Sequence, residues 1–484
     1  MYRLTRMPPR LLTAGLAVLI VACSLEVDES QLSGGAGVTL FEGARLIVGD
    51  GSAPIENSAF LVEGTRFVRI GRAGELESPD DAVRVDLTGK TVIPAFIDIH
   101  SHVGYENVPE GTELKENYTP ENLVDHMERY AYTGHAITVS LGSDPPEEWV
   151  WKMRDESEQP TFSGARFETV GRGLAWPGTG PAPRARNDAP YAIFTPWMAE
   201  AAVRELASHD VPFVKLWVED RNGFRVPGQK GPFVLSPDIS GAAITEAHRL
   251  GLRTMAHVKT VTELKDLLRA GVDMWTHPIA DALADEELLA LMRERPGLWY
   301  VPVFTPVGFG GGGAVQLAAG ERPGWLDDPL LGAIKCRPFL EDWGRQFEGR
   351  RSVSSPDGGI GGENARTFLE MGVRFALGSH DAGGNRILGW GSHMELESFV
   401  HWLGMTPHEA IVTATSAGAE LLGRSDLGSV AEGKSADFVV LDANPLEDIR
   451  NTRKISQVYL RGVEVDRSAM RARWEAECAS VGAT

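Results

Sequence analysis

Short apolar runs that end in polar residues recur along the middle of this chain. Eight of them follow in order: "TVIPAFIDIHSH", "AITVSLGS", "RFETVGRG", "PFVKLWVED", "RTMAHVK", "DMWTHP", "LWYVPVFT" and "RFALGSHD". Most are separated by segments with helical periodicity, such as "PWMAEAAVRELASHD", "ISGAAITEAHRLGL", "VTELKDLLRAG" and "DEELLALMRERPG", the last two with a terminal glycine typical of a helix C-cap. Strand–helix repeats in this number predict an α/β fold, a (β/α)8 TIM barrel with insertions.

Two β-rich segments flank the repeats, and their turns carry Gly and Asp. In 38–92, alternating runs such as "SAFLVEGTRFVRIG" predict antiparallel strands, and in 426–466 a similar pattern returns with "SADFVVLDANPL" and "ISQVYLRGVEV". We expect these segments to form one small β-sandwich beside a barrel at 93–425, followed by a C-terminal tail at 467–484.

The first 23 residues are typical of a secretory signal. Arg3, Arg6 and Arg10 precede an apolar stretch that is too short to span a bilayer comfortably. The stretch ends in "LIVAC", which resembles the cleavage box of bacterial lipoproteins, in which the cysteine, here Cys23, becomes lipidated. The polar, Gly/Ser-rich residues 24–37 predict a flexible tether. We therefore expect an exported protein on the periplasmic or cell-surface face, which is attached to the membrane only through this lipid anchor.

Charge and cysteine content disfavour several classes of binding partner and metal site. The 484 residues include 47 Lys and Arg against 67 Asp and Glu, a formal net charge of -20, which disfavours binding to nucleic acid and to anionic lipid surfaces. Beyond Cys23, the only cysteines are Cys336 and Cys478, and a disulfide between them stays open at this stage. There is no Cys-x-x-Cys pair, so a thiolate metal site is disfavoured. Assembly into a homo-oligomer is also left open.

The predicted strand ends carry metal-binding side chains. His100 and His102 end the first run, His257 the fifth and His277 the sixth, and Asp381 follows the eighth. A single histidine at a strand end is usually structural, but a barrel brings its strand ends together, and imidazole with carboxylate suits a divalent metal such as zinc. Alternate residues of a strand face the same way, so the His-x-His spacing points both rings into the barrel mouth.

Lys215 interrupts the apolar fourth run, where an unpaired ammonium would be costly to bury. An ion pair with Glu219 or Asp220 is one interpretation. The other is chemical: burial lowers the pKa of a lysine, and a neutral amine can take up carbon dioxide to form a carbamate whose two oxygens can bridge two metals.

From Val38 to Val465 the chain resembles the amidohydrolase superfamily. The resemblance is carried by "KTVIPAFIDIHSH", "PFVKLWVED", "EAHRLGLRTMAH", "THP" and the late "GMTPHEAIVTATSAGAELLG" and "LGSVAEGKSADFVVLDANPL". Within the superfamily it is most similar to the imidazolonepropionase-like and prolidase-like branch with a carboxylated lysine on the fourth strand.

Carried over residue by residue, the resemblance implies a binuclear site. One divalent ion, expected to be Zn2+, would be held by His100, His102 and Asp381, and a second by His257 and His277; the carboxylated Lys215 would bridge them. A hydroxide between the metals would be the nucleophile. Asp381 would take its proton as general base and deliver it to the leaving nitrogen.

This chain departs from the superfamily pattern at two places. Pro94-Ala95 stands where Pro-Gly is usual, and Gly378-Ser379-His380-Asp381 stands where Gly-Thr-Asp is usual. The second departure adds one residue to the eighth strand end. Asp381 remains the candidate ligand because "DAGG" continues from it, and a shifted strand end would bring His380 towards the site instead.

Other polar residues are assigned smaller roles. Tyr105 and Arg172 are candidate substrate contacts, the latter for a substrate carboxylate. Five further histidines fall in predicted helices or at their edges and are interpreted as structural: His126, His248, His393, His401 and His408. The "GFGGGGAV" segment lacks the Gly-Lys ending of a phosphate-binding loop and is interpreted as a flexible loop over the active-site mouth.

Three functions follow from these features. The first is hydrolysis of an amide-type C–N bond in a dipeptide, an N-acyl amino acid or a cyclic amide. The second is a mononuclear deaminase or an imidazolonepropionase-like hydrolase of a cyclic amidine; Lys215 favours two metals and so argues against it. The third, a non-catalytic surface-anchored binding protein, is disfavoured because every expected ligand position is filled.

Overall fold

The computed structural model describes residues 37–181, 188–218, 234–304, 322–348, 358–381 and 387–481. The chain divides into two compact units, 1–35 and 36–484, and only the second contains described residues. The predicted leader with Cys23, nearly all of the tether, Glu219, Asp220 and the glycine-rich segment lie outside the described residues, so their predictions stay predictions.

All eight apolar runs contain a strand that is parallel to its neighbours. These are β7 (Phe96–Ser101), β10 (His135–Ser140), β11 (Arg166–Thr169), β14 (Phe213–Trp217), β15 (Arg253–His257), β16 (Met274–Thr276), β17 (Trp299–Val301) and β18 (Arg374–Phe375). Hydrogen bonding divides them over two parallel sheets of order β11-β10-β7 and β13-β12-β14-β15-β16-β17-β18, where β12 is Leu174–Ala175 and β13 is Tyr191–Ala192. Strands with two covered faces read as continuous apolar runs, which explains the sequence pattern.

Backbone hydrogen bonds also connect β7 to the segment that follows β18. The amide of Ile99 donates to Leu377 at 2.9 Å, and the amide of His102 donates to Asp381 at 3.0 Å. Ser101 and Asp381 form a parallel bridge. The first and last of the eight runs therefore lie side by side, which brings His100 and His102 next to His380 and Asp381.

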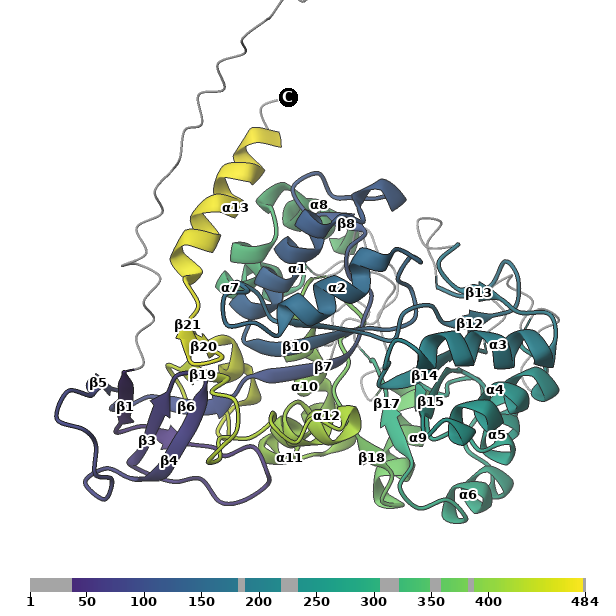
Figure 1. Ribbon diagram of the computed structural model, residues 1–484, viewed down its shortest axis with the longest axis horizontal. Helices are drawn as coiled ribbons and strands as arrows, with labels where there is room; N and C mark the ends of the chain where they lie inside the picture. Colours follow the sequence, from purple (N-terminus) through teal and green to yellow (C-terminus); the bar gives the residue numbers. More distant parts are fainter. Residues whose placement is uncertain are drawn as a thin grey trace, which may run out of the picture. The chain divides into compact units, whose positions relative to one another are not determined.

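Helices follow most of these strands in the chain (Figure 1). They are α1 (Pro120–Tyr132), α2 (Glu148–Ser157), α3 (Pro196–Ala207), α4 (Pro237–Arg249), α5 (Val261–Ala270), α6 (Glu286–Arg293), α9 (Gly359–Glu370), α10 (Trp390–Leu403), α11 (Pro407–Thr413) and α12 (Ser416–Leu422). The predicted helices α3 to α6 are confirmed. Gly271 ends α5 in a left-handed conformation, as predicted, but α6 ends at Glu294 with helical dihedrals and Gly297 comes three residues later. The glycine cap predicted for α6 was therefore wrong.

The segment after the seventh strand is partly helical. Within it, η4 (Gly324–Asp327), α7 (Pro329–Ile334) and α8 (Arg337–Glu348) precede α9. The glycine-rich residues 308–315 lie outside the described residues, so the flexible-loop interpretation stays a prediction.

Strands from both ends of the chain share one apolar core. One sheet has the order β4-β3-β1-β5 and the other the order β2-β6-β19-β20-β21. Their strands are β1 (Val38–Glu42), β2 (Arg45–Leu46), β3 (Ser58–Glu63), β4 (Arg66–Arg72), β5 (Val83–Asp86), β6 (Thr91–Pro94), β19 (Phe438–Leu441), β20 (Ile455–Leu460) and β21 (Val463–Glu464). Phe438 lies 5.1 Å from Phe41 and 5.2 Å from Phe60 between ring centroids, and β6 pairs antiparallel with β19 (Figure 1). The pairs β1–β3 and β3–β4 are antiparallel, as predicted for 38–92, whereas β1–β5 and β2–β6 are parallel, so the prediction is confirmed only for the first two pairs.

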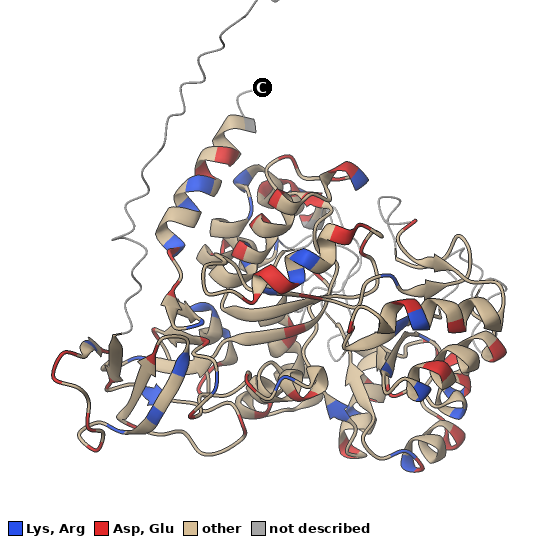
Figure 2. Ribbon diagram, in the orientation of Figure 1, with Lys and Arg blue, Asp and Glu red and all other residues tan. Residues whose placement is uncertain are grey.

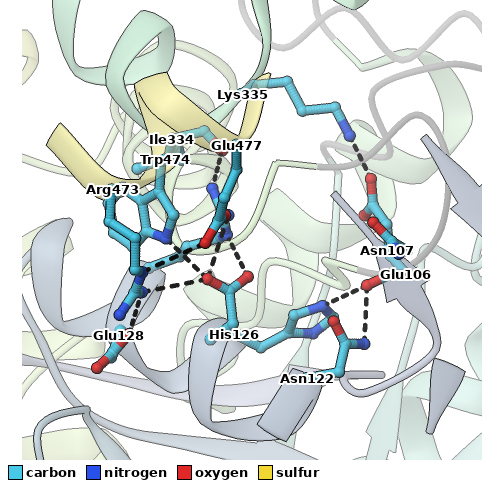
Figure 3. A network of polar contacts seen from close by, with 12 residues as sticks. Glu106, Asn107, Asn122, His126, Glu128, Ile334, Lys335, Arg473, Trp474 and Glu477 are labelled. Carbon is cyan, nitrogen blue, oxygen red and sulfur yellow. Dashed lines mark hydrogen bonds and ion pairs between the residues drawn. The ribbon is translucent and has the colours of Figure 1, made fainter. Parts of the chain in front are cut away.

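The predicted C-terminal tail contains helix α13 (Arg467–Val481), which docks on α1 (Figure 3). The indole of Trp474 donates to Asp125 at 2.7 Å, and Arg473 forms an ion pair with Glu128. The disulfide that the sequence left open is present between Cys336 and Cys478, with Cα atoms 5.5 Å apart.

Acidic and basic residues are interspersed over the outer helices (Figure 2). Several pair between helices: Arg204 of α3 contacts Glu246 of α4 at 2.8 Å, and Lys265 of α5 contacts Glu287 of α6 at 2.8 Å. Within the described part of the chain, none of the helices has the length and apolar character needed to cross a membrane.

Glu168 in β11 provides a test of how the burial of an acidic side chain affects stability. Burial, partly offset by the Thr169 amide, raises the pKa of Glu168 to about 7 from 4.5. The stability that the protonated carboxyl contributes is full below pH 4.5 and is lost as pH rises through 7, so Glu168→Gln should raise the free energy of unfolding at pH 8 by about 1–3 kcal/mol. Urea unfolding at pH 4 and pH 8 measures this, with exposed Glu77→Gln as control. An equal gain at both pH values would show that charge burial is not the cause.

Candidate metal centre

The two histidines of the His-x-His pair lie at the end of β7 with their rings close together. The ring centroids of His100 and His102 are 5.1 Å apart, and their Nε2 atoms are 3.3 Å apart. Both residues are buried. Two imidazole nitrogens at this separation form a donor arrangement that suits a divalent cation.

A hydroxyl group of β16 and a hydroxyl group just after β10 fix the orientation of both rings. Nδ1 of His100 is 2.7 Å from Oγ1 of Thr276, and Nδ1 of His102 is 2.8 Å from Oγ of Ser143. With the hydroxyl oxygens accepting from Nδ1–H, the lone pairs of both histidines are on Nε2, on the side where the rings converge. Such outer hydrogen bonds are what hold ligating histidines in one tautomer.

His257 at the end of β15 and His277 directly after β16 extend the group. Their ring centroids are 4.0 Å apart, and His277 lies 5.0 Å from His100. Nε2 of His277 is buried and has no hydrogen-bond partner among the described residues. Burial, and then the neighbouring histidines, hold the pKa of His277 well below 6.5, so the ring is a neutral donor at pH 7.

His380 belongs to the same group of rings. Its centroid lies 4.7 Å from His100, 4.9 Å from His102 and 4.9 Å from His277. In the described part of the chain, His100, His277 and His380 form a buried set whose ligand atoms all lie within 4.8 Å of one another, so the set could hold a metal ion.

Asp381 follows His380 in the chain, and its side chain faces the start of α10. Its Oδ2 accepts from the amide of Gly389 at 2.7 Å and from the hydroxyl of Tyr130 at 3.5 Å. A Cβ on Gly391 would be 2.3 Å from Oδ1, so only glycine lets the helix approach this closely. The carboxylate is therefore positioned by the first turn of α10.

Lys215 is fully buried in the middle of β14. A Cβ on Gly142 would be 2.7 Å from its Cγ, so Gly142 makes room for the side chain. Trp217 shares the face of Lys215 because the two are alternate residues of one strand. The ring of Trp217 lies 5.7 Å from His102 and 5.0 Å from His257, and the Nζ of Lys215 is 4.8 Å from that ring. Lys215 is thus on the same side of β14 as the histidines.

Asp98 ties the ends of β7 and β18 together. Its Oδ1 accepts from the amides of His100 at 3.0 Å and Ser379 at 3.1 Å. Burial, opposed by these hydrogen bonds, raises the pKa of Asp98 to about 6. Sequence reasoning missed Asp98, Ser143 and Thr276, although an acid inside the apolar "FIDIHSH" was a signal for the first.

The two candidate substrate contacts have structural partners. The hydroxyl of Tyr105 donates to the carbonyl of Ser143 at 2.7 Å, which supports the residue that orients His102. Arg172 donates to the carbonyl of Ala189 at 2.6 Å and stacks on Tyr191 at 4.2 Å. Neither observation tests contact with a substrate, which stays a prediction for both residues.

The five helical histidines include several with partners away from the centre. Nδ1 of His126 accepts from the amide of Gly104 at 2.9 Å, and its Nε2 is 2.8 Å from the carbonyl of Glu106 (Figure 3). His248 pairs with Asp273 at 2.9 Å, and His393 with Thr452 at 3.0 Å. His126 therefore braces the chain directly after the His-x-His pair.

A family model described as the Amidohydrolase family matches residues 354–465. This segment is therefore similar to the Amidohydrolase family. It includes β18, α10 and β19, and so contains His380 and Asp381.

Individual proteins similar to this chain extend the comparison. The ochratoxinase of Aspergillus niger is 28% identical over 218 residues, which are 44% of this chain and only 38% of the relative's length. The imidazolonepropionase of Streptomyces griseus subsp. griseus is 25% identical over 402 residues, 80% of this chain and 86% of that protein.

Solved structures show the same fold. A Xaa-Pro dipeptidase crystallised with methionine in its active site is 22% identical, covers 88% of this chain and 99% of its own, and has a TM-score of 0.64. The A. niger ochratoxinase structure is 20% identical, covers 89% and 95%, and has a TM-score of 0.63. At these identities the likeness concerns the fold.

Proposed function

We propose that this protein is a metal-dependent hydrolase that cleaves an amide-type C–N bond in a dipeptide, an N-acyl amino acid or a cyclic amide. The observation that carries the proposal is the convergence of His100, His102, His257, His277 and His380 around one buried point, with Lys215 and Asp381 beside it. The names of the similar proteins, ochratoxinase and Xaa-Pro dipeptidase, support an amide-type substrate.

The proposed scaffold is a (β/α)8 barrel with a sandwich built from both chain ends. Support comes from the parallel order of the strands and from the hydrogen bonds that join β7 to the residues after β18. In such a barrel the carboxyl ends of the strands form one rim, and loops around that rim set specificity. Apart from Lys215, which is in the middle of β14, the site residues lie at or after these strand ends.

In the proposed site, His100 and His102 would hold one divalent ion and His257 and His277 the other, and a carboxylated Lys215 would supply oxygen ligands. Zinc fits a donor set of imidazole nitrogens and carboxylate-type oxygens. When bound, the ions would polarise the scissile carbonyl and lower the pKa of water.

The chain's own proton-handling group is Asp381. Its Oδ2 is engaged by the amide of Gly389 at 2.7 Å, and its Oδ1 faces Gly391. A carboxylate fixed by a helix start can accept a proton from the attacking water and return it to the leaving nitrogen without reorienting. Burial of the surrounding rings excludes bulk water from this exchange.

A mononuclear deaminase or imidazolonepropionase-like reaction is the second candidate. It is favoured by the compact His100, His277 and His380 set, which could hold a single ion, and by the similarity to an imidazolonepropionase. Two bound ions per chain would exclude this alternative, and one would favour it.

The test is a hydrolysis screen of dipeptide, N-acyl amino acid and lactam libraries with zinc-loaded protein that lacks residues 1–23. We expect turnover in one of these classes, two metal ions per chain by elemental analysis, loss of activity with a chelator and recovery when zinc is returned. Protein that retains no metal after loading with Zn2+, and hydrolyses none of the three classes, would contradict the proposal.

A further inference from the structure

The end of β18 differs from a simple strand end. The strand itself covers only Arg374–Phe375, and the next residues are held by β7 instead. Asp98 accepts from the amide of Ser379, the amide of His380 donates to the carbonyl of His100 at 2.6 Å, and the carbonyl of Asp381 accepts from His102. Three successive residues are therefore fixed against the strand that carries the His-x-His pair.

His380 has a left-handed backbone conformation at this point, with φ of 54°. This region is unfavourable for residues with a Cβ, and such strain is concentrated at functional sites. The result is that the imidazole of His380, and not a residue of the usual strand alternation, enters the ring cluster formed by His100, His102 and His277.

The carboxylate of Asp381 has a different environment. Oδ2 accepts from the amide of Gly389, which is the N-cap residue of the 14-residue helix α10, and the helix start favours a negative charge. The group of ligand atoms within 4.8 Å of one another comprises His100, His277 and His380. The start of α10 thus contacts the carboxylate of Asp381, whereas the imidazole cluster includes the ring of His380.

From this juxtaposition we infer that His380 supplies the metal ligand at the eighth strand end, and that Asp381 is left to handle protons. The inference rests on the proposed metal centre. It separates two roles that the superfamily resemblance assigns to Asp381 alone, and the additional residue in Gly378-Ser379-His380-Asp381 is what allows the separation.

The inference is tested by metal binding rather than by turnover. Zn2+ affinity is measured by competition with a chromophoric chelator, and the visible spectrum of the Co2+-loaded protein reports the ligand set. His380→Ala should weaken Zn2+ binding at one site more than about 100-fold and change the cobalt spectrum, because a direct ligand outweighs the roughly 10–100-fold effect of the groups that merely support ligands. His380→Asp should recover part of the affinity because it supplies a carboxylate donor in place of the imidazole.

Asp381→Asn should leave the Zn2+ affinity within about 3-fold of the parent and the cobalt spectrum unchanged, which is well below the loss expected for a ligand. His248→Ala, a change in the outer helix α4, is the matched control, and circular dichroism checks the fold of each variant. Should His380→Ala misfold, His380→Gln preserves more of the side-chain volume and is measured in its place.

Unchanged affinity and spectrum in the His380 variants, together with metal loss in Asp381→Asn, would overturn the inference and make Asp381 the ligand. A parent protein that binds no Zn2+ would overturn the proposed function itself, so the two failures are distinguishable.

Discussion

Asp381→Asn should lower kcat at least about 100-fold while the protein keeps its metal, because general acid–base groups contribute about 10²–10⁴-fold to such reactions. The amide has nearly the shape of the carboxylate but cannot accept a proton. The side chain is fixed by Gly389 and faces Gly391, so the substitution changes chemistry more than packing. We expect the loss mainly in kcat, since a proton acceptor acts in the transition state rather than in substrate binding.

The measurement is steady-state kinetics from pH 5 to 9 with the substrate found in the screen. Loss of the acidic limb of the profile in Asp381→Asn would support a proton acceptor, because that limb reports ionisation of the essential base. Asp81→Asn, in an exposed loop between β4 and β5, is the matched control. If Asp381→Asn keeps parental kcat at every pH, Asp381 is not the base.

The strand positions were predictable because each strand of the parallel sheets is covered on both faces. A strand covered on both faces needs a continuous run of apolar residues, and each of the eight runs contains a strand. The convergence of His100, His102, His257 and His277 follows from the same periodicity, because strand ends on one side of the sheets lie together.

The supporting groups were not predictable by the same reasoning. Thr276 and Ser143 reach the histidines from other strands, across 176 and 41 residues of sequence, and hydroxyl-containing residues are common at strand ends. Arg172 stays a candidate substrate contact, and its guanidinium also donates to the carbonyls of Ala189 and Pro190, which no periodic signal predicted. The disulfide joins residues 142 apart and depends on how α13 docks, which no local pattern encodes.

The eighth strand end was ambiguous for a physical reason. One additional residue shifts the alternation of side chains by one position and so exchanges inward and outward directions. Sequence alone leaves His380 and Asp381 as competitors. In the structure, the fixed amides of Ser379 and His380 and the left-handed conformation of His380 direct the ring of His380 into the cluster.

Lys215→Ala should reduce the bound metal from two ions to one or fewer per chain and lower kcat/KM at least about 100-fold, because it removes the proposed bridge between the ions. The basis is the position of Lys215. It is fully buried in β14, on the face where Trp217 contacts His102 and His257. Burial favours the neutral amine over the ammonium, and only the neutral amine can take up carbon dioxide.

Three measurements separate a carbamate bridge from a lysine that merely fills space. Reconstitution of the parent in bicarbonate-free buffer should give less metal and less activity than reconstitution with bicarbonate, and ¹³C-labelled bicarbonate should produce a carbamate carbon signal in the parent that is absent from Lys215→Ala. A short carboxylate such as propionate should restore part of the activity to the alanine variant, since it fits the space left by the side chain and supplies two oxygens. Lys152→Ala, at an exposed position of α2, is the matched control.

Two bound ions and parental activity in Lys215→Ala would eliminate the bridge. A single bound ion in the parent would instead favour the mononuclear reaction, in which the cluster of His100, His277 and His380 would hold the one metal.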